Sequence, residues 1–312
     1  MRRTKFLFTL CSFLLFAMTA NGALILMRSR DVRPGPEPVP IAYYKDDSAV
    51  RMDFQQTQQR DADDEMPVNL LVLGLDDEET RSDVILLFNY KPGTTGLNIL
   101  SVARDTLVHS GGKSCKINAL YSKGGELLVA DKVSQLTRLP VHYYVTVNLR
   151  GFRKIVDILG GVRFDVPFRM NYDDPTQKLH IHLKKGMQLL DGKQAEQLVR
   201  YRKGNYKRQG YTDGDIGRIK MQQAFIKALI DQKLNLGYIS NADELFGVLR
   251  THAKTNLEFS DIARYSGSLL KMNSGEIHAV TLPGTSRMID GAWYLIADEE
   301  EARRVIDESF YK

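Results

Sequence analysis

VNLLVLGL, residues 68–75, is an almost continuous apolar run, and Asp76 follows it directly. Only Asn69 interrupts the run, which is typical of a strand that is buried on both faces. Two similar runs, residues 83–90 and 97–102, are joined by the segment KPGTTG, whose Pro and Gly favour a hairpin. The three runs therefore predict the central strands of a sheet.

Further strands and helices alternate along the rest of the chain. Helical spacing of apolar residues predicts helices over residues 124–139, 149–159, 189–199, 219–236, 243–250, 261–271 and 298–310. Apolar runs predict strands over residues 142–148, 162–166, 179–183 and 276–282. The segment NYDDP at 171–175 predicts a loop, and Asn148 is a suitable cap for the helix that follows it. Because no composition break interrupts this alternation, we predict one α/β domain over residues 67–312, with a mixed central sheet flanked by helices.

The beginning of the chain differs from this pattern. Residues 6–27 contain no formal charge over 22 positions, which is enough to cross a bilayer as a helix, and three basic side chains precede them. We therefore expect a short cytoplasmic tail at residues 1–5, a transmembrane anchor at 6–27 and a stalk at 28–66 that is rich in Pro, Gln, Asp and Arg. This arrangement places the domain outside the cytoplasm, at the cell membrane. A cleaved signal peptide is the alternative, because small residues follow the apolar run.

The charge distribution argues against a nucleic-acid partner. The chain has a net charge of +5, from 43 basic and 38 acidic residues. Residues 1–33 hold six of the basic and one of the acidic residues, which leaves 37 of each in the remainder. A domain that binds nucleic acid normally has a basic excess of its own, so we expect none here.

Several common catalytic centres are missing from the sequence. Only Cys11 and Cys115 are present, which provides neither a disulfide framework nor a cysteine metal site. No Gly-x-Ser-x-Gly and no Gly-x-x-x-x-Gly-Lys motif occurs, so an ordinary nucleotide hydrolase is excluded. His180 and His182 would share one face of a strand and could bind a metal. With no third ligand nearby in the sequence, a polar, solvent-facing strand is the favoured interpretation.

A basic segment extends from Val199 to Gln222. The segment contains two acidic residues and seven basic ones. The basic residues are Arg200, Arg202, Lys203, Lys207, Arg208, Arg218 and Lys220. Arg200 and Arg202 are two positions apart, so an extended backbone would point both to one face. Arg218 and Gln222 are four apart and would share one side of a helix. The guanidinium fork suits a phosphate-like oxyanion, although a solvated charged face is the alternative.

Acidic residues mark the ends of the first strands. Asp76 follows the first strand and Asp83 begins the second, with Arg81 between them, and Arg104 and Asp105 follow the third. Ligands of α/β proteins commonly bind at such strand ends. Two carboxylates there can share a hard cation that also takes phosphate oxygens as ligands. The spacing therefore predicts Mg²⁺ or Mn²⁺ on Asp76 and Asp83.

More than a dozen motifs, taken in order, resemble the LytR-CpsA-Psr family. They are Asp76, Arg81-Ser82-Asp83, Ser101 to Thr106, Lys116-Ile117-Asn118-Ala119, Tyr121, Gly124-Gly125, Val147-Asn148-Leu149, Gly160-Gly161-Val162, Tyr172-Asp173-Asp174-Pro175, Leu190-Asp191-Gly192, Val199-Arg200-Tyr201-Arg202, Asp215 to Arg218 and Gln222. The resemblance implies one catalytic domain of this family, acting as an extracytoplasmic phosphotransferase. Such enzymes move a glycopolymer, such as teichoic acid or capsule, from undecaprenyl pyrophosphate to peptidoglycan through a phosphodiester.

The resemblance also implies a role for each candidate residue. The pyrophosphate would be bound by Arg104, Arg200, Arg202, Arg218 and Gln222, with Arg81 approaching from the acidic side. Asp76 and Asp83 would hold Mg²⁺, and Asp105 would accept the proton of the attacking hydroxyl. Two alternatives would use the same residues: a non-catalytic, membrane-anchored sensor of lipid pyrophosphate, and a pyrophosphate hydrolase.

Overall fold

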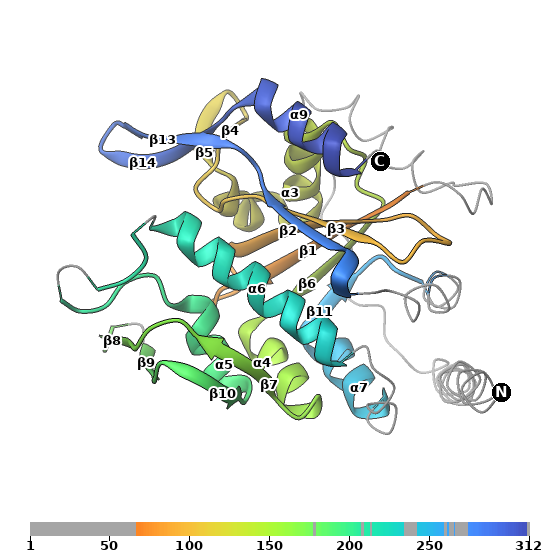
Figure 1. The fold of residues 1–312 in the computed structure, drawn as a ribbon. Helices are drawn as coiled ribbons and strands as arrows, with labels where there is room; N and C mark the ends of the chain where they lie inside the picture. The colour runs from red at the N-terminus through yellow and green to blue at the C-terminus, as the bar shows by residue number, and fades with distance from the viewer. Residues whose placement is uncertain are drawn as a thin grey trace, which may run out of the picture.

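The structure is a computed structural model that describes residues 67–176, 179–206, 209–212, 214–233, 242–258, 261, 265 and 274–310 (Figure 1). The predicted tail, anchor and stalk, residues 1–66, lie outside the described residues. Among the helices that are described, none combines the length and the apolar composition that a bilayer crossing requires. The organisation of the first 66 residues therefore stays a prediction.

A six-stranded mixed sheet forms the centre of the domain, in the order β11-β6-β1-β2-β3-β12. Its strands are β1 (Val68–Leu75), β2 (Ser82–Tyr90), β3 (Leu97–Ser101), β6 (Tyr143–Val147), β11 (Ala253–Thr255) and β12 (Ile277–Thr281). β1 runs parallel to β6 and antiparallel to β2, whereas β3 runs antiparallel to β2 and parallel to β12. The predicted mixed sheet and its central hairpin are therefore confirmed.

Helices cover both faces of this sheet. They are α3 (Tyr121–Thr137), α9 (Glu299–Phe310) and α6 (Asp215–Lys233). Successive residues of β2 point to opposite faces. Leu87 is buried with Val133 of α3 and Ile306 of α9, whereas Leu86 belongs to a cluster with Ile226 of α6. Figure 1 accordingly shows α3 and α9 on one side of the sheet and α6 on the other.

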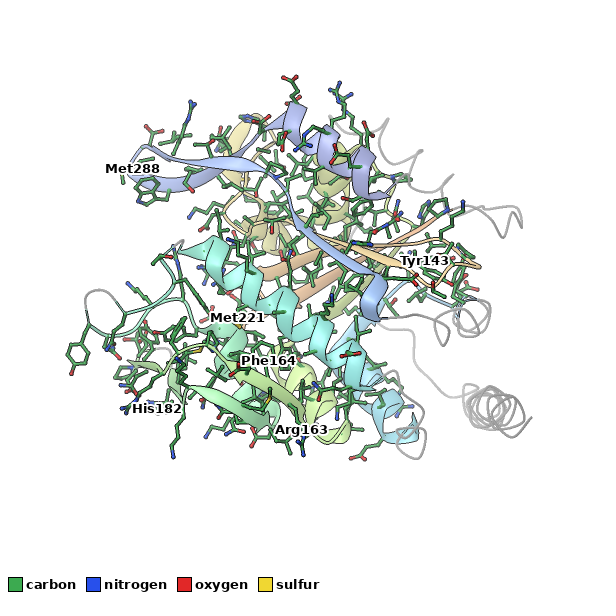
Figure 2. All side chains as sticks on the ribbon, in the orientation of Figure 1. Tyr143, Arg163, Phe164, His182, Met221 and Met288 are labelled. Atoms are coloured by element: carbon green, nitrogen blue, oxygen red, sulfur yellow. The ribbon has the colours of Figure 1, made fainter. Side chains whose placement is uncertain are left out.

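A second, smaller layer packs against α6. It contains α4 (Leu149–Ile158), α5 (Gly192–Arg200) and the strand pairs β7 (Val162–Val166) with β10 (Gly186–Leu190) and β8 (Met170–Asp174) with β9 (Leu179–Leu183). The ring of Phe225, on α6, lies 6.0 Å from that of Phe152 and 5.9 Å from that of Phe164. Phe164 is labelled in Figure 2. These buried aromatic contacts fix α6 between the central sheet and the second layer.

Two predictions are corrected in the second layer. The predicted loop at 171–175 is wrong for residues 171–174, which belong to β8 and pair with β9, whereas Pro175 lies in the turn that follows. The predicted helix 189–199 begins only at Gly192, because the preceding residues form β10 and pair with β7. Asp191 then caps α5 through a hydrogen bond that its side chain accepts from the Gln194 N–H at 2.7 Å.

The remaining elements lie around these layers. They are β4 (Leu107–Ser110), β5 (Lys113–Lys116), the short helix η3 (Ile117–Leu120), α7 (Ala242–His252), the short helix η5 (Ser274–Glu276), β13 (Gly284–Ile289) and β14 (Ala292–Ala297). The Asn148 cap is confirmed, since its side chain accepts a hydrogen bond from the Gly151 N–H at 2.8 Å. The predicted helix 261–271 lies outside the described residues, apart from Asp261 and Tyr265.

Candidate active site

Strand ends and helix ends meet at one edge of the sheet. β2 begins where β1 ends, and β3 ends beside the start of β2, because each neighbouring pair is antiparallel. α5 ends at the same edge, where Arg200 Nη1 donates to Asp77 Oδ2 beyond β1 at 2.9 Å. Gln222, in α6, donates from Nε2 to the Val199 carbonyl at 2.9 Å and so ties α6 to the end of α5. The structure thus brings the predicted acidic and basic segments together.

Asp76 organises the turn between β1 and β2. Its Oδ1 accepts hydrogen bonds from the backbone N–H groups of Thr80 at 2.8 Å and Arg81 at 3.1 Å, and its Oδ2 accepts one from Arg81 Nε at 3.2 Å. Burial raises the pKa of Asp76, but the donors of Arg81 and Thr80 outweigh burial and hold this pKa below its usual value. Asp76 is therefore an ionised carboxylate at neutral pH.

Arg104, which follows β3, pairs with Asp83 near the start of β2. Arg104 Nη1 donates to Asp83 Oδ1 at 3.0 Å. Burial lowers the pKa of Arg104, but the carboxylates of Asp83, Asp215 and Asp105 outweigh burial and raise this pKa above its ordinary value. Arg104 thus carries a fixed positive charge between three acidic side chains.

Arg218, in the first turn of α6, is the most buried of the predicted arginines. Its side chain is 7% exposed, and Nη2 lies 2.5 Å from Asp215 Oδ1. Burial lowers the pKa of Arg218, and the positive charge of Arg104 lowers it further. The Nε–H groups of Arg104 and Arg218 both lack a hydrogen-bond partner among the described residues. Buried donors normally have a partner, so these two are suited to an oxyanion.

Arg200 and Arg202 have different surroundings. Arg200 is the last residue of α5, and its Nη1 also donates to Glu196 Oε1 at 2.8 Å. Tyr201 is buried and leaves the helix, and Arg202 beyond it is exposed. The extended backbone predicted through both arginines is therefore wrong at Arg200, because α5 continues to that residue.

Asp105 has a basic partner that the site prediction did not include. Its Oδ1 lies 2.9 Å from Lys116 Nζ at the end of β5. Lys116 belongs to one of the motifs of the resemblance, which was the only signal for it. Gln223 is a second addition, since its Nε2 donates to Ser101 Oγ at 2.8 Å and to the Val280 carbonyl at 2.9 Å. Gln223 thereby joins α6 to β3 and β12 directly behind the site.

A hollow elsewhere on the domain is separate from this site. It lies between α3, β4, β14 and α9, and its lining includes Lys132, Arg138 and Arg303. None of the predicted site residues contributes to it. The candidate site is thus a polar edge of the sheet that is distinct from this hollow.

The domain that carries this site matches a known family. The model of the LytR_cpsA_psr family matches residues 41–310. This chain belongs to the LytR-CpsA-Psr family. The polyisoprenyl-teichoic acid–peptidoglycan teichoic acid transferase TagU of Bacillus licheniformis is 30% identical to this chain over 253 residues. The match covers 80% of this chain and 78% of TagU.

Solved structures of LytR-CpsA-Psr proteins have the same fold. The crystal structure of B. subtilis TagV matches with a TM-score of 0.66 at 26% identity, covering 79% of this chain and 98% of TagV. The crystal structure of B. subtilis TagU matches with a TM-score of 0.57 at 29% identity, covering 79% of this chain and 97% of TagU. The predicted family and its mixed α/β fold are therefore confirmed.

Proposed function

We propose that this chain transfers a glycopolymer from a polyprenyl pyrophosphate, such as the undecaprenyl carrier, to peptidoglycan through a phosphodiester. Family membership supports this function, as does the similarity to transferases named for teichoic acid and peptidoglycan. The observation that carries it is the pair Arg104 and Arg218, whose buried Nε–H donors lack partners among the described residues. A pyrophosphate offers acceptor oxygens on two phosphorus atoms and can satisfy several arginines at once.

The reaction exchanges one phosphorus–oxygen bond for another. A hydroxyl of peptidoglycan attacks the phosphorus that carries the glycopolymer, in line with the oxygen that bridges the two phosphates. The bond from this phosphorus to the bridging oxygen breaks, and polyprenyl phosphate leaves with the electron pair. The hydroxyl proton passes to a base, and the product is a phosphodiester between peptidoglycan and the glycopolymer.

The arginines bind and orient the pyrophosphate. Arg104 lies close enough to Arg218 for its positive charge to lower the pKa of Arg218, and a bound anion would relieve this repulsion. Arg200 and Arg202 approach from the end of α5, and Arg81 approaches from the turn after β1. Gln222 uses one amide N–H on the Val199 carbonyl, which positions α6 against α5, and its second N–H is available to donate to the pyrophosphate.

A divalent cation, Mg²⁺ or Mn²⁺, fits the carboxylates of Asp76 and Asp83. Both side chains lie at the ends of neighbouring strands. Both offer carboxylate oxygens, which are the ligands that a hard cation prefers. Arg81 and Arg104 now contact these carboxylates, so positive charge is already favoured beside them. When bound, the cation offsets phosphate charge and aids departure of the lipid phosphate.

Asp105 is the proposed base for the attacking hydroxyl. It follows β3, next to Arg104, and its ion pair with Lys116 holds the carboxylate in place. A positioned carboxylate within hydrogen-bond reach of the hydroxyl accepts its proton in the transition state. We also propose that the reaction takes place outside the cytoplasm, on the membrane side where peptidoglycan lies and where the predicted anchor would hold the domain.

Transfer of label tests the function. The full chain in detergent is incubated with a radiolabelled polyprenyl-pyrophosphate glycan and peptidoglycan oligomers. We expect covalent label on peptidoglycan. Label released as free glycan phosphate would establish the hydrolase instead, and donor binding without any product, across several glycans and with metal present, would establish the sensor.

Metal removal and Asp83→Ala are expected to reduce transfer by about 10²-fold or more, because each removes charge compensation worth several kcal/mol. The assay above measures the rate after chelation, after return of Mg²⁺, and in the variant. The exposed Asp165→Ala, on β7, is the matched control and is expected to retain the rate. Full activity of the chelated protein or of Asp83→Ala would contradict the cation site.

Arg104→Ala is expected to weaken binding of inorganic pyrophosphate by about 10- to 100-fold, since a hydrogen bond to a charged group contributes about 1.5–3 kcal/mol. Calorimetric titration of the full chain in detergent measures the dissociation constant. The exposed Arg163→Ala, on β7, is the control and is expected to bind as the parent does. Equal affinity of Arg104→Ala and the parent would remove Arg104 from the anion site.

A further inference from the structure

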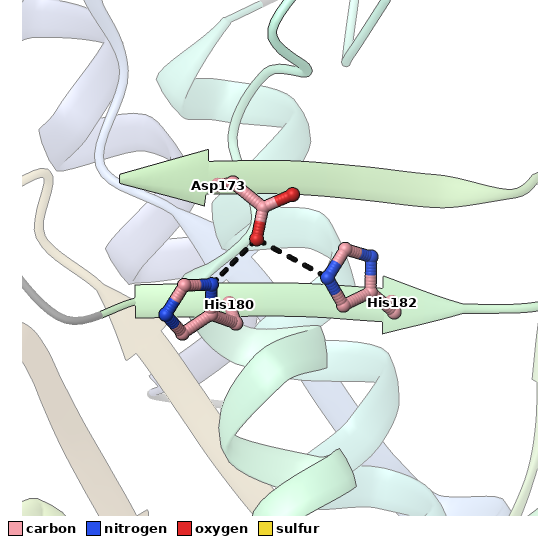
Figure 3. A group of neighbouring side chains, drawn as sticks. All are labelled: Asp173, His180 and His182. Carbon is pink, nitrogen blue, oxygen red and sulfur yellow. Dashed lines mark hydrogen bonds and ion pairs between the residues drawn. The ribbon is translucent and has the colours of Figure 1, made fainter. Parts of the chain in front are cut away.

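The outer face of the β8–β9 hairpin carries a cluster of metal-ligating side chains. Asp173 lies directly across from His180, and Asn171 lies directly across from His182. The alternate residue Ile181 points the other way and is buried, so the four polar side chains share the solvent-facing side. Figure 3 shows Asp173 reaching toward both imidazoles from the neighbouring strand.

The ligand atoms already converge. Asp173 Oδ1 lies 2.6 Å from His180 Nδ1 and 3.2 Å from His182 Nε2, and one ligand atom from each residue lies within 4.8 Å of the others. Tetrahedral Zn²⁺ with bonds of about 2.0–2.1 Å separates its ligands by about 3.3 Å. The Asp173–His182 separation matches this value, whereas the Asp173–His180 separation is shorter and the His180–His182 separation is at most 4.8 Å. Small rotations of the exposed His180 and His182 side chains would bring the separations to the tetrahedral value.

Two asparagines hold these ligands in position. His182 Nδ1 lies 2.6 Å from Asn171 Oδ1, so this nitrogen can donate to the amide oxygen, and Nε2 is the ring nitrogen that lies beside Asp173. Metal-bound histidines commonly make such a second hydrogen bond. Asn205, in the loop after α5, accepts a hydrogen bond from the Asp173 N–H at 2.7 Å and donates to the Asp173 carbonyl at 2.8 Å.

We propose that Asp173, His180 and His182 bind one divalent transition-metal ion, Zn²⁺ in preference to Mg²⁺, and leave a fourth position to water. Two imidazole nitrogens and one carboxylate suit zinc, whereas Mg²⁺ prefers oxygen ligands alone. The side chains are 58%, 53% and 40% exposed for His180, His182 and Asp173, which gives the ion access from solvent. Through Asn205, which is bonded to the backbone of Asp173, the ion would stabilise the contact between the hairpin and the loop after α5. This site is independent of the proposed transfer reaction.

Metal titration of the full chain in detergent, without a histidine tag, tests the site. Calorimetry with Zn²⁺ is expected to give saturable binding of one ion per chain at this site, and Co²⁺ is expected to show the visible absorption bands of a tetrahedral complex. His180→Ala, His182→Ala and Asp173→Asn are each expected to weaken Zn²⁺ binding by at least about 10-fold, because loss even of an outer-shell partner has an effect of this size. Asn171→Ala is expected to weaken it by about 10-fold.

The controls separate this site from other histidines and from the candidate active site. His278→Ala changes an exposed histidine on β12, and Asp83→Ala changes the proposed Mg²⁺ site. Both are expected to retain Zn²⁺ binding, and circular dichroism of every variant verifies its fold. Absence of saturable Zn²⁺ binding, or binding that the hairpin variants leave unchanged, would overturn the proposal.

Discussion

Arg200→Ala and Arg202→Ala are each expected to reduce transfer to peptidoglycan by about 10³- to 10⁵-fold, the effect of an arginine that stabilises charge in a phosphoryl-transfer transition state. Arg200 is placed for this role because α5 ends at it, and Asp77 and Glu196 hold its guanidinium at the mouth of the sheet. Arg202 lies within range of the charge of Arg218, although its own side chain is exposed. The label-transfer assay measures the rates.

The controls distinguish lost chemistry from lost folding. Arg200→Ala leaves Glu196 paired with Arg153 at 3.2 Å, so no buried carboxylate is left alone. Arg200→Lys keeps the charge but loses the fork, and we expect it to recover little of the rate. Thermal unfolding verifies that each variant is folded. Retention of more than roughly a tenth of the parent activity by either alanine variant would refute its placement in the reaction.

Phe225→Ala is expected to lower the free energy of unfolding by about 3–5 kcal/mol, as for other buried aromatic residues. Phe225 is fully buried and contacts Phe152 and Phe164, so the truncation leaves a cavity between α6 and the second layer. For a domain of this size the melting temperature should fall by roughly 10 °C. Thermal unfolding followed by circular dichroism measures it.

The matched control for Phe225 is an exposed aromatic residue. Tyr206 is 71% exposed, and Tyr206→Ala is expected to change stability by less than about 0.5 kcal/mol. If Phe225→Ala melted within a degree or two of the parent, α6 would not depend on this aromatic contact. Because α6 carries Arg218 and Gln222, a loosened α6 should also weaken pyrophosphate binding.

The main elements of the fold follow from local patterns. The run at residues 68–75 becomes β1 with the predicted bounds, because its apolar side chains are buried on one face and half-buried on the other. Asn148 caps α4 as predicted, because a cap needs only the N–H groups that follow it in the chain. The candidate site residues were identified from the order of the family motifs along the sequence, which requires no coordinates.

Partners from distant segments could not be found in this way. Residues 171–175 have the composition of a loop, and only pairing with β9 makes residues 171–174 a strand. This pairing places Asp173 beside His180 and His182, and so supplies the third residue of the proposed zinc site that the neighbouring sequence lacked. In the same way, Lys116 meets Asp105 only because β4 and β5 fold back as a hairpin.

The sequence alone therefore determined the central strands, the alternation with helices, the family and the residue types of the candidate site. Only the tertiary structure showed that α5 ends at Arg200, which acidic residues pair with the arginines, and how deeply Arg218 is buried. The physical reason is the distance along the chain between the residues that interact. Burial patterns and caps depend on residues within a few positions, whereas charge pairs and short polar strands are stabilised by partners that only the folded chain brings close.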